Sequence, residues 1–203
     1  MTPEMLVALA AFALATSVTP GPNNVMLLAS GLNYGFRATL PHMLGISLGH
    51  AVMVALVGLG LAAALLGWPP ARMALQGLAA AYVLWLAWRI ATAAPPAAPG
   101  EVARGRPFTF LQAAAFQWVN PKAWVMAVGA IALFAPGGDV AAVLPVAAVF
   151  AAVNLPSVAV WAAAGVGLRR LLGRPRLLRA MNIAMAVLLV ASMLPALMAP
   201  LPG

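Results

Sequence analysis

Two short polar segments interrupt long apolar stretches of this chain and carry groups that could bind a small charged molecule. Residues 19–24 hold a threonine, two prolines, a glycine and two asparagines, and residues 120–122 hold an asparagine, a proline and a lysine. Amides donate and accept hydrogen bonds and an ammonium group donates three, so together they suit a small zwitterion. At membrane depth, irregular backbone is tolerated only where it is buried in protein or lines a cavity. The two segments therefore predict a binding site.

The first segment is expected to open a helix. Pro20 and Pro22 have no N–H group to donate, and Gly21 allows backbone angles that are closed to other residues. If Pro22 begins a second half-helix, the N–H groups of residues 23–25 lack intrahelical partners and can bind a carboxylate. Across the gap, the released carbonyl groups of roughly residues 15–19 can accept hydrogen bonds from an ammonium group.

Lys122 strengthens this interpretation. An ammonium group at the bilayer centre costs on the order of 3 kcal/mol or more, so it normally faces the protein interior with a partner. The acidic residues Glu4, Glu101 and Asp139 all lie at the ends of apolar stretches or between them. Lys122 must then be neutral, hydrogen-bonded to carbonyl groups or paired with a substrate anion. The alternative is that its side chain snorkels to the membrane surface.

The composition places the chain in a membrane. Of its 203 residues, 65% are hydrophobic and 7% are charged, and the mean hydropathy is +1.01. A span needs roughly 20 apolar residues, so nearly every segment between the polar loops can cross a bilayer. We predict an all-α integral membrane protein with six spans, at residues 5–32, 38–67, 71–93, 108–133, 140–168 and 178–199.

The spans are expected to form one transmembrane domain, 1–203, made of two halves. Prolines and a glycine predict an extended linker at 94–107, between a first half at 1–93 and a second at 108–203. Three spans is an odd number, so a duplicated unit would be inverted relative to its twin. This arrangement is common in secondary transporters, with the site at the repeat interface. The breaks in the first and fourth spans both fall near mid-membrane.

Two further polar positions lie at a similar predicted depth. His50 is near the centre of the second span, and Asn154, followed by Pro156, is near the centre of the fifth. We predict that these residues line the site or take part in coupling; the alternative is a structural hydrogen bond between helices. If a proton gradient drives the protein, His50 and Lys122 are the central titratable groups apart from tyrosines.

The arginines predict the orientation. Nine of them lie in the first, third and fifth connections, whereas the second and fourth connections hold only Arg72. By the positive-inside rule, the arginine-rich connections, including the linker, face the cytoplasm. The nine are Arg37, Arg89, Arg104, Arg106, Arg169, Arg170, Arg174, Arg176 and Arg179.

The two breaks also carry a resemblance to a known family. Residues 19–24, the glycine at position 31, the Gly-Phe-Arg at 35–37, the glycine step at 45–49 and the later Asn-Pro-Lys resemble the lysine-exporter (LysE/RhtB) family of amino-acid exporters. The resemblance covers essentially the whole chain. It implies a multi-pass protein of the bacterial inner membrane that is not an enzyme. It also implies export of amino acids or close derivatives by ion-gradient-driven, proton-antiport alternating access.

The resemblance places the functional residues at both breaks. The predicted substrate-binding residues are Asn23, Asn24, Asn120 and Lys122. The residues predicted to shape the site are Thr19, Pro20, Gly21, Pro22 and Pro121. Small or aliphatic neutral amino acids are the favoured substrates, because the sequence places no carboxylate at the centre of a span.

Other functions fit less well. An exporter of metal or inorganic ions would need several carboxylates, thiolates or imidazoles inside the membrane, and this chain has no cysteine and one central histidine. A membrane scaffold would explain the spans but not a buried lysine beside a break. We expect no catalytic set, metal or cofactor, and no nucleic-acid partner, because the arginines lie in short loops. Lipid is an expected partner, and small-residue spacing at 31–35 and 45–49 leaves internal packing or a homodimer open.

Overall fold

Helices form the secondary structure throughout the described part of the chain. The computed structural model describes residues 1–66, 68–93, 106–172 and 175–198, so most of the predicted linker at 94–107 lies outside it. The all-α prediction is confirmed for these residues. In chain order the helices are α1 (Pro3–Val18), α2 (Pro22–Tyr34), α3 (Phe36–Leu56), the π-helix η1 (Val57–Leu61), α4 (Ala62–Leu66), α5 (Pro69–Ala91), α6 (Phe110–Gln117), α7 (Pro121–Phe134), α8 (Val140–Leu172) and α9 (Pro175–Met198).

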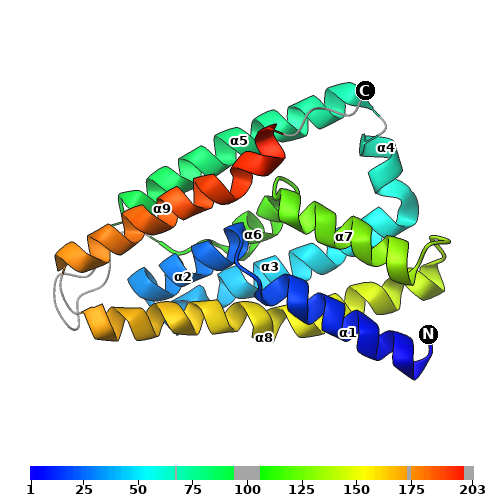
Figure 1. Ribbon diagram of the computed structural model, residues 1–203, viewed down its shortest axis with the longest axis horizontal. Coiled ribbons are helices and arrows are strands. Elements are labelled where there is room, and N and C mark those ends of the chain that lie inside the picture. The colour runs from blue at the N-terminus through cyan, green and yellow to red at the C-terminus, as the bar shows by residue number, and fades with distance from the viewer. Residues whose placement is uncertain (67, 94–105, 173–174, 199–203) are drawn as a thin grey trace.

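The first predicted break is confirmed. Helix α1 ends at Val18 and α2 begins at Pro22, with the two helix axes bent by 59°. Pro22 occupies the first turn of α2, where a missing N–H group costs nothing. Figure 1 shows α1 and α2 meeting at this bend in the middle of the molecule.

The second predicted break is also present. Helix α6 begins with a capping box, in which the side chains of Thr109 and Gln112 each bond the other's backbone N–H group, and it ends at Gln117. Helix α7 begins four residues later, at Pro121. Proline fits the first turn of a helix and disfavours helical backbone in the residue before it, so the chain restarts its helix here.

The predicted count of six spans is not confirmed. Among the described residues, four helical segments are long and apolar enough to cross a membrane, and the bent pair α1 and α2 raises the number to five. The 14-residue α7 is apolar but too short to be a span alone. The fourth span exists only if α6 and α7 count together, and that remains a prediction.

The helix of the predicted second span, 38–67, is kinked near its C-terminal end. After Leu56 the backbone widens into η1, and Gly60 takes a φ of 101°, which a residue with a side chain rarely adopts. Gly58 lies so close to Val143 of α8 that an added Cβ atom would be 2.7 Å from it. The two glycines therefore kink the helix around its neighbour, a tertiary effect that the hydropathy pattern does not contain.

Each broken helix packs against the long helix of the opposite half. Helices α1 and α2 contact α8, and α6 and α7 contact α3. Helices α3 and α8 also contact each other, whereas α5 and α9 pair along one edge of the bundle (Figure 1). The middle helices of the two halves thus bring both breaks into the centre of the structure.

Glycines allow the closest of these approaches. A Cβ atom on Gly31 of α2 would overlap the carbonyl group of Ala162 in α8, and one on Gly165 of α8 would overlap that of Leu28. Gly45 of α3 lies against Phe110 of α6 in the same way. These small residues serve packing within the chain, as in membrane helix pairs generally.

We expect Gly31→Ala to destabilise the protein, because the new methyl group has no space at the α2–α8 contact. Overpacking of this kind costs about 1 to 3 kcal/mol, so the apparent melting temperature in detergent should fall by several degrees. The matched control is Gly77→Ala in α5, where an added Cβ meets no atom within 4 Å. Equal melting temperatures for the two variants would contradict the close contact.

Candidate functional site

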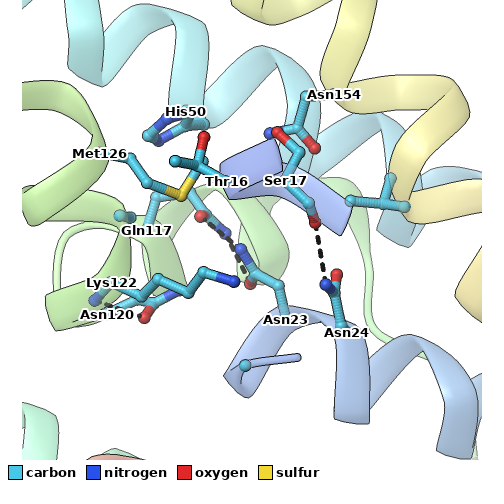
Figure 2. A pocket seen from close by; sticks show the side chains of 13 residues that line it. Thr16, Ser17, Asn23, Asn24, His50, Gln117, Asn120, Lys122, Met126 and Asn154 are labelled. Carbon is cyan, nitrogen blue, oxygen red and sulfur yellow. Dashed lines mark hydrogen bonds between the residues drawn. The ribbon is translucent and has the colours of Figure 1, made fainter. Parts of the chain in front are cut away.

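The two breaks enclose one polar cavity. It has about 300 Å³ of empty volume, open surroundings included. Figure 2 shows polar side chains from α1, α2, α3, α8 and the second break pointing into it. The lining residues are Thr16, Ser17, Gly21, Asn23, Asn24, His50, Gln117, Asn120, Lys122, Ala123, Met126, Asn154 and Val158.

A pair of amides joins the two breaks. Asn23 Nδ2 donates to Gln117 Oε1 at 2.9 Å, and Gln117 Nε2 donates back to Asn23 Oδ1 at 3.1 Å (Figure 2). Gln117 also donates to the carbonyl oxygen of Ala113, which fixes the orientation of its amide. The start of α2 is therefore tied to the end of α6 through a reciprocal contact between residues 94 positions apart.

Lys122 crosses from α7 to the first break. Its ammonium group donates to the carbonyl oxygen of Thr19 at 2.6 Å, to Thr19 Oγ1 at 2.9 Å and to the carbonyl oxygen of Pro20 at 3.3 Å. Of the three possibilities that the sequence left open, bonding to carbonyl groups is the one observed. The ammonium group thus satisfies backbone acceptors that the helix break sets free.

Four of the released carbonyl groups, those of residues 16–19, accept hydrogen bonds from the protein's own donors. The sequence predicted that they could accept from a substrate ammonium group. Asn24 Nδ2 instead donates to the carbonyl oxygens of Ser17 and Thr19, and Trp161 Nε1 of α8 donates to that of Val18 at 3.1 Å. The Thr19 hydroxyl donates to the carbonyl oxygen of Thr16. A bound ammonium group would have to displace one of these donors or use other acceptors.

The two half-helices that begin at the breaks differ in how their N-termini are capped. Asn120 caps α7 by accepting a hydrogen bond from the Lys122 N–H group at 3.2 Å. At α2, Gly21 provides no side-chain cap, and the first backbone bond is from Val25 to Gly21. Within the described chain, the N–H groups of residues 23 and 24 have no acceptor. The uncapped start of α2 is therefore the stronger anion position in this cavity.

Three buried polar side chains of the cavity lack hydrogen-bond partners in the described part of the protein. They are Ser17 Oγ on α1, both ring nitrogens of His50 on α3 and Asn154 Oδ1 on α8. His50 is only 1% exposed and contacts the ring of Phe150. An unpaired buried polar group costs about 1 to 3 kcal/mol, which a ligand that bonds to it can recover.

The structure brings together the predicted residues from both halves. Asn23, Asn24, Asn120, Lys122, His50 and Asn154 all line this one cavity. Pro156 lies inside α8 and does not line it, while Thr19, Pro20, Pro22 and Pro121 shape the backbone around it. That the lining residues bind substrate stays a prediction.

Sequence reasoning missed Gln117, Ser17 and Thr16. Gln117 had a detectable signal, because it is a polar residue three positions before the Asn-Pro-Lys break in an otherwise apolar run. Ser17 and Thr16 are common in membrane helices, where their hydroxyl groups bond the preceding turn, as Thr16 does with the carbonyl oxygen of Phe12. Their types alone did not mark them as cavity residues.

Chemically, the cavity offers partners for both ends of a small zwitterion. The free N–H groups at the start of α2 and the nearby Lys122 suit a carboxylate. Asn154 Oδ1, Ser17 Oγ and an unprotonated nitrogen of His50 can accept hydrogen bonds from an ammonium group.

Comparisons with known proteins identify the family of this chain. The family model described as LysE type translocator matches residues 14–194. This chain is 35% identical to cysteine/O-acetylserine efflux proteins of Escherichia coli (strain K12), Shigella sonnei (strain Ss046) and Shigella flexneri serotype 5b (strain 8401). Each match extends over 193 residues, which is 94% of this chain and 96% of the relative. No solved structure gave a significant match. This chain therefore belongs to the LysE type translocator family and is a multi-pass membrane translocator, not an enzyme.

Proposed function

We propose that this protein exports small neutral amino acids or close derivatives, such as cysteine and O-acetylserine, across the bacterial inner membrane. The observation that carries the proposal is the polar cavity between the two helix breaks, which holds unpaired donors and acceptors inside an apolar bundle. The names of the efflux proteins that share 35% of its residues support the same substrate class.

The carboxylate of the substrate binds at the start of α2. There it accepts hydrogen bonds from the N–H groups of Asn23 and Asn24, and the Lys122 ammonium group turns from Thr19 toward it. Asn120, which caps α7, holds Lys122 at the correct depth. The substrate ammonium group bonds Asn154 and Ser17, whose oxygen atoms lack partners without it.

Gly21 has a steric role in this site. A Cβ atom at position 21 would be 2.7 Å from Cδ of Lys122, so a larger residue there would displace the lysine side chain from its path across the break. The prolines on either side keep the backbone open.

Transport follows from movement between two halves of one domain. We propose that residues 1–93 and 108–203 are inverted repeats, with α6 and α7 together forming the fourth span. The support is that each broken helix packs on the middle helix of the other half. The arginine-rich connections face the cytoplasm. The Asn23–Gln117 and Lys122–Thr19 contacts join the halves and must exchange as access alternates.

An ion gradient drives export, and the proton is the proposed coupling ion. His50 and Lys122 are titratable groups that line the cavity together. Substrate binding changes the contacts of Lys122, which links its protonation to occupancy of the site.

We expect purified protein in liposomes to release labelled O-acetylserine and cysteine when a proton gradient is imposed. Lys122→Ala should lower the initial rate by tenfold or more, because losing one charged hydrogen bond to a bound carboxylate costs roughly 1.5 to 3 kcal/mol. Arg176→Ala, at an exposed position near the start of α9, is the matched control and should keep its rate. If a folded Lys122→Ala protein transports normally, the export function would stand and the proposed carboxylate site would fall.

We expect Asn23 and Gln117 to be energetically coupled. In a double-mutant cycle with Asn23→Ala and Gln117→Ala, thermal unfolding should give a coupling free energy of about 1 kcal/mol. The control cycle pairs Asn23→Ala with Asn182→Ala. Asn182 bonds Asn33 and makes no contact with Asn23, so these effects should add. Additive effects in the Asn23–Gln117 cycle would refute a contact between the breaks.

A further inference from the structure

A second polar cavity lies at the arginine-rich end of the bundle. It has about 370 Å³ of empty volume, open surroundings included, and sits between the C-terminal half of α2, α3, the end of α5 and residues 106–108. It shares no lining residue with the cavity at the breaks. The residues that carry its chemistry are Ser30, Asn33, Tyr34, His42, Arg89 and Arg106.

His42 lines this cavity and has no hydrogen-bond partner among the described residues. Its side chain is 0% exposed, and neither ring nitrogen makes a hydrogen bond to any described residue. Its ring lies 5.2 Å from that of Phe108, measured between centroids. Burying an imidazole without hydrogen-bond partners costs free energy. Because His42 lines a polar cavity, we expect a ligand to supply the missing hydrogen bond.

Arg89 lies on the same aromatic ring. Its guanidinium carbon is 5.5 Å from the centroid of Phe108 and 5.1 Å from that of Trp85. Arg89 Nη2 donates to the carbonyl oxygen of Arg106 at 3.1 Å. A guanidinium group has five N–H donors in a fixed fork, so this contact orients it and leaves donors for a carboxylate.

The remaining wall of the cavity is held rigid by paired polar groups. Asn33 and Asn182 exchange reciprocal amide hydrogen bonds at 2.9 and 3.1 Å, and Asn182 also donates to the carbonyl oxygen of Ala93. Ser30 and Thr39 share a hydrogen bond of 2.9 Å. The cavity is therefore a built site in which these amides and hydroxyls are satisfied and His42 is not.

We propose that this cavity is a second amino-acid site, in which Arg89 binds the substrate carboxylate and His42 accepts a hydrogen bond from its ammonium group. The inference rests on the proposed function in one respect: the arginine-rich end faces the cytoplasm, so the site loads substrate on the side from which it is exported. Arg89 and His42 bind the two charged ends of the amino acid, and no residue of the cavity is assigned to its side chain.

The two sites are neighbours along α2. Asn23 lines the first and Met26 lines the second, and three residues of helix rise about 4.5 Å. Met26 and Phe116 belong to one buried apolar cluster, and Tyr82 stacks on Phe116 with ring centroids 5.4 Å apart. Phe116 precedes Gln117, so this cluster adjoins both cavities.

The chain has no cysteine, so a single introduced thiol can report on this cavity. The reporter is Ala93→Cys, at a lining position, and the control reporter is Thr92→Cys, on the exposed neighbouring residue. Both are made in the Lys122→Ala background, which weakens the first site, and placed in phosphatidylcholine nanodiscs. The rate of maleimide labelling is measured against the concentration of O-acetyl-L-serine.

We expect O-acetyl-L-serine to slow labelling at position 93 and not at position 92. Arg89→Gln should raise the half-protecting concentration about tenfold, as expected for the loss of a charged hydrogen bond. Arg176→Gln, outside the cavity, should leave it unchanged. The carboxamide of O-acetyl-L-serine should not protect, which tests the carboxylate contact without any change to the protein's fold.

Three results would overturn the second site: no protection at position 93, equal protection with Arg89→Gln, or equal protection by the carboxamide. If phosphatidylglycerol slows labelling and the amino acid does not, Arg89 binds a lipid headgroup. That result would also overturn the second amino-acid site. Efflux from liposomes is measured separately with the natural chain. Efflux without protection refutes only the second site, whereas protection without efflux refutes only the proposed export function.

Discussion

The backbone carbonyl groups at the first helix break must find hydrogen-bond donors inside an apolar bundle, and the rest of the site depends on how they do. At membrane depth such groups need partners from the protein or from a water-filled cavity, and here side chains provide them. Asn24, Trp161 and Lys122 donate from α2, α8 and α7 respectively. Satisfying one short stretch of backbone therefore ties α7 and α8, whose donors lie 103 and 143 positions away, to the first break.

Tight helix packing makes these long-range contacts possible. Glycines let α2 approach α8 and let α3 approach α6 until backbone touches backbone. The broken helices then rest on rigid neighbours, and the side chains at their breaks meet within hydrogen-bonding distance. Helices α5 and α9 pair with each other at one edge of the bundle and leave the first cavity to the other helices.

The sequence was sufficient to predict both breaks, the helix start at Pro22 and the convergence of His50 and Asn154, because proline chemistry and hydrophobic depth are local properties. It did not predict the kink at Gly60, the role of Gln117 or the partners of Lys122. Each of these depends on which surfaces pack together, and that information is spread over residues about 90 or more positions apart. The number of complete spans was the weakest inference, since α6 and α7 are each short and hydropathy alone cannot join them.

The hydrogen bonds from Lys122 to Thr19 and Pro20 have a consequence for the vacant protein. With its ammonium group on the carbonyl oxygens of the break, the protein carries an internal substitute for a bound cation, and the amide pair of Asn23 and Gln117 likewise satisfies itself. With these acceptors paired, the vacant protein leaves no bare carbonyl group at Thr19 or Pro20. A substrate carboxylate that draws Lys122 away must compensate for the contacts that the lysine gives up.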